Sequence, residues 1–207
     1  YSNMKPKPVS VRNATVNDIP GIINVGKAAY AQWPSHSLAN ARNYELQIAA
    51  FPEGQFVAVC DGIVVGYCAC LIVHLDADSP WYAHGEITGY GTFSTHTPSG
   101  NTLYGADIAV HPDWQGKGVS KKLYTARKQL LRRHNLKQMI AGGRIPGYRD
   151  HQGKLTAREY VDKVIAGELK DAALNAHLKA GYEVHGVHFG YIDDAESLGF
   201  ATHLVMA

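Results

Sequence analysis

The segment Gln115–Ser120, QGKGVS, contains residue types that can bind a phosphate group through the backbone. It follows an apolar run that stops at Pro112 and precedes apolar residues at helical spacing, so it joins a strand to a helix. At a helix start about four backbone N–H groups lack a partner, and the helix dipole adds about half a positive charge. Gly116 and Gly118 have no Cβ, so an anion can approach the backbone closely. The turn therefore predicts a binding site for a phosphate or diphosphate.

This turn differs from two other phosphate-binding sequences. It contains neither GxxxxGK followed by Ser or Thr, the P-loop pattern, nor GxGxxG, the dinucleotide fingerprint. Two glycines can also form only a tight connection between a strand and a helix, so the surrounding sequence decides between the two interpretations.

The sequence around the turn resembles the cofactor-binding motif of the GNAT acyltransferases. That motif is written Gln/Arg-x-x-Gly-x-Gly/Ala, and Gln115, Gly118 and Ser120 occupy its fixed positions, with Ser120 replacing Gly or Ala. In that family the turn grips the diphosphate of acetyl-CoA, and pantetheine lies along the preceding strand. The resemblance implies acetyl-CoA as cosubstrate, bound by Ile108, Ala109, Val110, Gln115, Gly116, Lys117, Gly118, Val119 and Ser120.

The resemblance covers nearly the whole chain and is most specific between residues 86 and 186. There the sequence is similar to the acetyltransferase domain that many bacteria fuse ahead of a nitrilase-like amidase. The implied function is an acetyl-CoA-dependent N-acetyltransferase of bacterial type. It would move an acetyl group to a primary amine of a small molecule or peptide, by direct transfer in a ternary complex.

The resemblance assigns the catalytic base to Asp107, on the strand before the turn. An alkylamine with a pKa of about 10.4 is almost fully protonated at neutral pH, and freeing its lone pair costs roughly 4 kcal/mol. Since an aspartate is a weak base, we expect Asp107 to act through water. A structural salt bridge or cap is the alternative for Asp107; Glu86 and His111 are reserve bases, although His111 is expected to position the turn. A backbone N–H near Val110 would stabilise the oxyanion.

The resemblance also places an acid in the helix that Gly181 closes. GNAT enzymes commonly carry Tyr four residues before this glycine, where this chain has His177, and Asn seven residues earlier, where it has Lys170. His177 is the predicted acid, and a purely structural histidine is the alternative. The leaving thiolate has a pKa of about 8.5, so an acid contributes only modestly.

Residues predicted to contact the acceptor are Glu86, Arg144 and Tyr148. An acidic loop with Asp193, Asp194 and Glu196 could attract a cationic amine, or its charges could simply be solvated.

The histidines and cysteines do not have the spacing of a metal site. His185 and His188 are an odd number of residues apart and point to opposite faces of a strand, while Cys68 and Cys70 have no second pair. We expect no metal.

Hydrophobic periodicity and turn residues predict the elements that position these groups. Strands are expected over 9–15, 102–112, 137–146, 183–192 and 200–207, helices over 15–33, 38–51, 155–169 and 171–182 and after the QGKGVS turn, and a hairpin over 55–75. Asp61-Gly62 should form its type I′ turn, 76–101 a long loop with short strand pieces, and Gly142-Gly143 a break in the strand. This order predicts a single-domain α/β GNAT fold: a mixed, mostly antiparallel sheet, splayed between its fourth and fifth strands, with helices on both faces.

Composition sets further bounds. A chain of 207 residues, 45% hydrophobic and 18% charged, fits one globular domain, expected over 9–207, with 1–8 a disordered segment or a cloning remnant. A net charge of +2 is too small to argue for nucleic acid, and the basic residues concentrated on the helix over 121–133, Arg127 among them, are expected to form a solvated face. No run is long enough to span a membrane. The absence of an apolar leader and three cysteines in apolar runs indicate the cytoplasm. A homodimer is left open.

Two further functions are compatible with the sequence. An acyl-CoA-binding regulatory module with little or no turnover would explain why His177 and Lys170 replace the family's usual residues. A different enzyme that binds a phosphate ligand is the third interpretation.

Overall fold

The computed structural model describes residues 7–34 and 37–207. The expected disordered segment, 1–8, lies outside these residues except for Lys7 and Pro8. Lys7 forms an exposed ion pair with Asp61, with Nζ 2.8 Å from the carboxylate oxygen.

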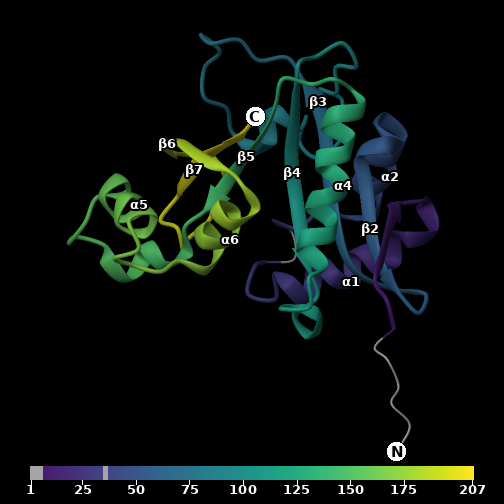
Figure 1. Ribbon diagram of the computed structural model, residues 1–207, viewed down its shortest axis with the longest axis horizontal. Helices are drawn as coiled ribbons and strands as arrows, with labels where there is room; N and C mark the ends of the chain where they lie inside the picture. The colour runs from purple at the N-terminus through teal and green to yellow at the C-terminus, as the bar shows by residue number, and fades with distance from the viewer. Residues whose placement is uncertain (1–6, 35–36) are drawn as a thin grey trace, which may run out of the picture.

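Within the described residues, seven strands form one mixed sheet in the order β1-β2-β3-β4-β5-β7-β6 (Figure 1). The β4–β5 pair is parallel, and the other neighbouring pairs are antiparallel. The predicted mixed, mostly antiparallel sheet is therefore confirmed. The strands are β1 Ser10–Asn13, β2 Gln55–Cys60, β3 Ile63–Val73, β4 Thr102–Val110, β5 Gln138–Arg144, β6 Glu183–Phe189 and β7 Phe200–Met206.

Helices cover both faces of the sheet, as predicted. Helices α1 and α2 pack on one face against Val57 and Tyr67, and α4 packs on the other against Cys68 and Cys70. Helices α5 and α6 lie beside the β5–β7–β6 part (Figure 1). The helices are α1 Ile19–Ala29, α2 Ala41–Ala50, α3 His84–Ile87, α4 Val119–Arg133, α5 Ala157–Ile165 and α6 Ala172–Ala180, with short 3₁₀ turns at Val16–Asp18, Pro52–Gly54, Pro112–Trp114 and Pro146–His151.

Several local predictions are confirmed. Asp61 and Gly62 have φ of 53° and 76°, the two positive values that a type I′ hairpin turn requires. The α5 capping box forms, with Thr156 and Glu159 exchanging side-chain and backbone hydrogen bonds. Gly181 closes α6 in the left-handed conformation, with φ of 110°.

Strands β4 and β5 pair over a short distance and then separate. Their register joins only Thr102, Leu103 and Tyr104 of β4 to residues 138–140 of β5. This separation is the predicted splay between the fourth and fifth strands. On the other edge of β4 the register with β3 shifts between Ala69 and Cys70, so that Ala106 is an extra residue in a β-bulge.

Two element predictions are wrong. Gly142 and Gly143 do not break the strand, because β5 continues through both of them to Arg144. A Cβ on Gly142 would lie 2.2 Å from the Tyr191 ring, and one on Gly143 would lie 2.4 Å from Thr202 Oγ1. These glycines therefore allow close packing inside the sheet. The loop 76–101 contains the single helical turn α3 and no strand among its residues, all of which are described.

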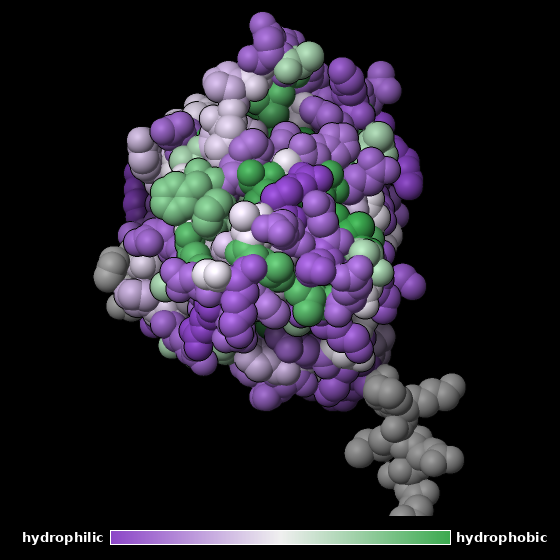
Figure 2. Space-filling model, turned by 90° about the vertical axis from the view of Figure 1, so that its left-hand side faces the viewer, coloured by the Kyte–Doolittle hydropathy of each residue, from purple (hydrophilic) through white to green (hydrophobic). Residues whose placement is uncertain are grey.

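The face that carries α5, α6 and β6 mixes apolar and polar residues (Figure 2). Phe189, at the end of β6, is 71% exposed. Among the residues described here, no helix has the length and apolarity needed to cross a bilayer.

Candidate active site

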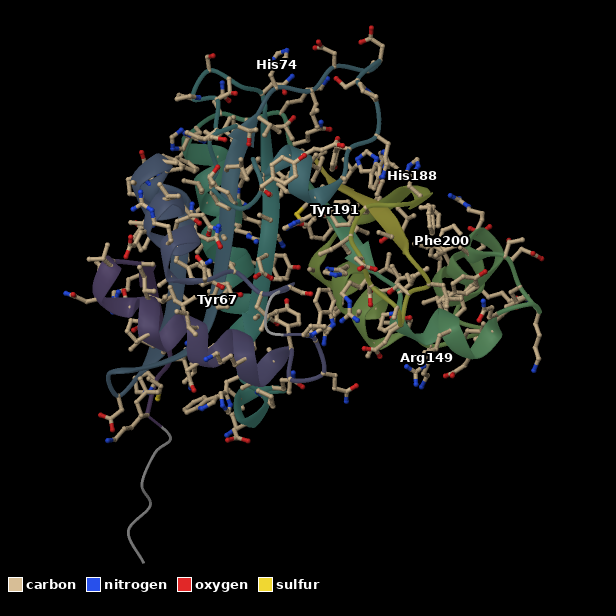
Figure 3. The ribbon with its side chains drawn as sticks, turned by 180° about the vertical axis from the view of Figure 1, so that it is seen from behind. Tyr67, His74, Arg149, His188, Tyr191 and Phe200 are labelled. Carbon is tan, nitrogen blue, oxygen red and sulfur yellow. The ribbon has the colours of Figure 1, made fainter. Side chains whose placement is uncertain are left out.

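A cavity of about 560 Å³ lies at the β4–β5 splay. Its walls come from α1, α2, β3, β4, β5, α4 and α6, so it reaches both faces of the sheet. In Figure 3, Tyr67 lies on the sheet beside α1 and Tyr191 lies nearer β6, with β4 between them. Both tyrosines line the cavity, as does Asp107.

Asp107 is held by two tyrosine hydroxyls. Tyr30 donates to Oδ1 over 2.9 Å, and Tyr67 donates to Oδ2 over 2.5 Å. Tyr44 donates in turn to the Tyr67 hydroxyl over 3.3 Å. Burial, followed by the charge of Asp107, raises the pKa of Tyr30 and of Tyr67 well above the usual value. Both phenols therefore stay protonated at neutral pH and fix the carboxylate in the cavity.

The arrangement around Asp107 differs from its structural alternative. Among the residues described, its carboxylate forms no ion pair, and its hydrogen bonds come from tyrosines rather than from a helix start. Each of its oxygens keeps lone pairs free to accept another proton donor, such as a water or an amine.

The turn between β4 and α4 has the geometry of an anion cradle. Gly116 and Gly118 have φ of 74° and 77°, and a Cβ on either would meet nothing within 4 Å. Gly118 is the N-cap of α4 and supplies no side-chain cap. Within the described chain, the N–H groups of residues 116–121 donate no hydrogen bond to the backbone or a side chain. A diphosphate fits these open amides.

The free edge of β4 supplies further donors. The N–H of His111 bonds to the carbonyl of Val65 on β3. Since alternate residues of a strand direct their backbone groups to opposite edges, the N–H groups of Val110 and Ile108 face the splay. The Ile108 carbonyl, on the same edge, accepts a bond from Tyr30 over 3.3 Å.

His111 positions the turn, as expected. Its Nδ1 accepts a bond from the Asp113 N–H over 3.2 Å and so caps the 3₁₀ turn after β4.

His177 and Tyr124 form a pair on the α4 and α6 side of the cavity. The Tyr124 hydroxyl lies 3.3 Å from His177 Nδ1, and both residues line the cavity. Burial, and then the charge of Arg127, lowers the pKa of His177 to about 4. His177 is therefore neutral at pH 7. Burial raises the pKa of Tyr124, which keeps its hydroxyl proton.

The three predicted acceptor residues have different positions. Arg144 lines the cavity, with its guanidinium 5.0 Å from the Trp33 ring centroid. Glu86 is exposed on α3 and does not line the cavity. Tyr148 lies away from the cavity and donates to the Leu155 carbonyl, so its contacts are those of a core residue.

The acidic loop does not present a free negative rim. Asp194 is 3% exposed and forms a two-bond ion pair with Arg144, at 2.7 and 3.0 Å. Ser197 also donates to this carboxylate. Arg144 therefore neutralises the buried acid, and Glu196 adds a longer contact at 3.4 Å.

Sequence reasoning missed four residues of this site. Tyr30 and Tyr67, which hold Asp107, gave no motif signal because Tyr30 follows the end of α1 and Tyr67 lies on β3. Tyr124 and Arg127 lie on α4, and the periodicity placed Arg127 on the solvated face, whereas it is 1% exposed and lines the cavity.

Over residues 7–34 and 37–207, no group of three or more His, Cys, Asp or Glu side chains is arranged to hold a metal ion.

Known proteins are similar in sequence to this chain. A model of the Acetyltransferase (GNAT) family matches residues 73–146. The chain is 31% identical over 201 residues to "Uncharacterized N-acetyltransferase YkwB" of Bacillus subtilis (strain 168), which covers 97% of this chain and 89% of that protein. It is 34% identical over 200 residues to "Probable hydrolase YhcX" of the same organism, covering 95% of this chain but 38% of that relative. The resemblance to a domain fused ahead of an amidase stays a prediction.

The fold is shared with solved structures. The "GphF GNAT-like decarboxylase in complex with isobutyryl-CoA" superposes with a TM-score of 0.82 at 22% sequence identity. The match covers 96% of this chain and 98% of that one. At this identity the likeness shows the fold.

Proposed function

Because this chain belongs to the GNAT acetyltransferase family, we propose that it transfers the acetyl group of acetyl-CoA to a primary amine, directly, in a ternary complex. The observation that carries the proposal is the pairing of two features. An open amide cradle lies at the start of α4, and a carboxylate held by two tyrosines faces a cavity at the splay.

The cradle and the edge of β4 would hold the cosubstrate. The amides of residues 116–121 and the α4 dipole bind the diphosphate, and the pantetheine arm lies along the free edge of β4 beside Ile108, Ala109 and Val110. Gln115, Lys117, Val119 and Ser120 belong to the same loop. Acetyl-CoA supplies the activated acyl carbon; the chain supplies position and proton transfer.

Asp107 would then serve as the base. It accepts a proton from the attacking amine through a water molecule, the amine nitrogen bonds to the thioester carbon, and the N–H group of Val110 stabilises the oxyanion. The C–S bond breaks as the intermediate collapses, which gives the amide and the thiolate of coenzyme A. The held carboxylate needs no side-chain rearrangement to accept the proton.

The thiolate would take its proton from Tyr124, with neutral His177 as the partner of that hydroxyl. Both residues lie on the α4 and α6 side of the cavity. His177 is thus a positioning residue in this proposal, and the family's acid is supplied from a different helix.

A catalytically weak acyl-CoA-binding regulatory module is the second candidate, because His177 replaces the tyrosine that the family carries.

The free, buried thiols of Cys60, Cys68 and Cys70 fit the proposed cytoplasmic location.

The proposed function predicts thiol release that depends on an amine. Purified protein with acetyl-CoA and a panel of primary amines should release coenzyme A faster than the same mixture without amine, followed with a thiol reagent. Calorimetry with coenzyme A alone should show binding. Tight binding without release for any amine would favour the regulatory module, and no binding at all would exclude both candidates.

Replacement of His177 tests its neutral state. With a pKa of about 4, His177 has no proton to lose between pH 5.5 and 8. We expect the pH profile of kcat/KM for His177→Gln to keep its shape over this interval. The value of kcat/KM should fall by less than about tenfold, because the thiolate of coenzyme A leaves readily even without an acid. Tyr124→Phe should lower kcat more than His177→Gln does. Disappearance of a limb near pH 6.5 in His177→Gln would show instead that His177 titrates as the acid.

A further inference from the structure

Arg127 is a buried charge that the proposed chemistry does not use. It lies on α4, is 1% exposed and lines the cavity. A guanidinium stays protonated in proteins. No Asp or Glu of the described residues lies within ion-pair distance of it. Arg144, in contrast, lines the same cavity but is paired with Asp194.

The side chains around Arg127 are neutral. Burial raises the pKa of the Cys68 thiol and raises that of Cys70 to about 12. Burial also raises the pKa of Tyr124 and Tyr182, and His177 is uncharged at neutral pH. The nearest aspartate, Asp107, directs its carboxylate to Tyr30 and Tyr67 on the other face of the sheet. The positive charge therefore has no counter-charge in the described chain.

The hydrogen bonds of Arg127 leave much of the guanidinium unused. Nη2 donates to the carbonyls of Ala69, at 3.0 Å, and of Asp107, which are register partners beside the bulge at Ala106. Nε is buried without a partner, and both bonds come from Nη2. A neutral donor could satisfy two carbonyls, so these bonds do not account for a buried charge.

Gly105 on β4 leaves room for the Arg127 guanidinium. A Cβ on Gly105 would lie 2.9 Å from Arg127 Nη1. Glycine at this position therefore admits the guanidinium next to the strand, where β4 and β5 begin to separate.

The position of Arg127 limits which anion it can meet. It follows Gly118 by nine residues on α4, a helical rise of about 13 Å, so it cannot contact a diphosphate held at residues 116–121. It does bond the carbonyl of Asp107, the residue before Ile108, whose N–H faces the splay. Because the pantetheine arm is uncharged, a cosubstrate anion that reaches Arg127 would belong to the acyl group.

We propose that Arg127 binds a carboxylate on the acyl group, so that short carboxyacyl-CoA thioesters, such as malonyl-CoA, occupy this site as a second donor class beside acetyl-CoA. The proposal rests on the acyl-CoA site proposed above. An acetyl group brings no charge to Arg127, whereas a carboxylate supplies the missing counter-charge and can accept charge-assisted hydrogen bonds from the N–H groups that the Ala69 and Asp107 carbonyls leave free.

Equilibrium binding to the wild-type chain tests this selectivity. Calorimetry should show malonyl-CoA binding at least tenfold more tightly than butyryl-CoA, which has a neutral acyl group of similar size. Equal affinity for the two would overturn the carboxylate site and leave the acetyltransferase proposal standing. Failure of every acyl-CoA to bind would overturn both.

Charge removal tests the assignment to Arg127. Arg127→Gln keeps an N–H donor for the bulge carbonyls and should bind malonyl-CoA and butyryl-CoA equally, while Arg144→Gln should keep the preference. If Arg127→Gln still bound malonyl-CoA more tightly than butyryl-CoA, the carboxylate site would be refuted. It would also be refuted if the wild type showed no such preference and Arg127→Gln only slowed acetyl transfer. The comparison of the two ligands on the wild type holds even if Arg127→Gln does not fold.

Discussion

Asp107→Asn should lower kcat/KM for amine acetylation by about 100- to 1,000-fold, the usual contribution of a general base. Asparagine has nearly the same shape, and its side-chain oxygen can still accept a bond from Tyr30 or Tyr67. It cannot take up the proton of the attacking amine. The affinity for coenzyme A should stay within about twofold, because no atom of the cradle changes. Initial rates of thiol release and calorimetry measure the two quantities.

Asp171→Asn is the matched control for this change. Asp171 is a buried aspartate that, like Asp107, accepts a tyrosine hydroxyl, from Tyr160 over 2.6 Å, but it does not line the cavity. Its replacement should reduce stability and leave the rate per folded molecule within about twofold. Similar rates for wild type and Asp107→Asn would show that Asp107 is not the base and that a water or another group accepts the proton.

Gly118→Asp should weaken coenzyme A binding by about 100-fold or more. A like charge about 5 Å from a phosphate, at an effective dielectric constant of about 20, costs about 3 kcal/mol. Aspartate tolerates the left-handed conformation better than most residues, so the φ of 77° at this position should be kept at modest cost. Calorimetry with coenzyme A gives the change in affinity.

Gly153→Asp provides the same backbone test without the cradle. Gly153 has φ of 78°, and a Cβ there would also meet nothing within 4 Å. Both variants should lose similar free energy of unfolding, while Gly153→Asp should bind coenzyme A as the wild type does. Unchanged affinity in Gly118→Asp would mean that the diphosphate lies elsewhere.

Features fixed by local chemistry could be predicted from the sequence. The Asp61-Gly62 turn, the Thr156 capping box and the glycines of the cradle each depend on the conformations of adjacent residues. The strand–turn–helix around Gly118 was therefore readable as a motif, and the family resemblance followed from it.

Features fixed by distant parts of the chain could not. Tyr30, at the end of α1, and Tyr67, on the neighbouring strand β3, both bond to Asp107, and neither spacing nor residue type predicts that they meet there. The pattern of α4 placed Arg127 with the exposed basic residues, because nothing local reveals that a bulge in β3–β4 exposes two carbonyls to it. The pair Gly142-Gly143 predicts a strand break, but glycine is needed at 142 because a side chain there would collide with the Tyr191 ring.

The parallel pairing of β4 and β5 is the shortest in the sheet, and it lies where the proposed donor would bind. Three register positions join β1–β4 to β5–β7–β6 along this seam. A pantetheine arm carries its own amide groups and can bond to the unpaired edge of β4 as a foreign strand would. The bound cosubstrate would then bridge the two parts of the sheet, and the enzyme would be more rigid in its acyl-CoA complex than when it is free.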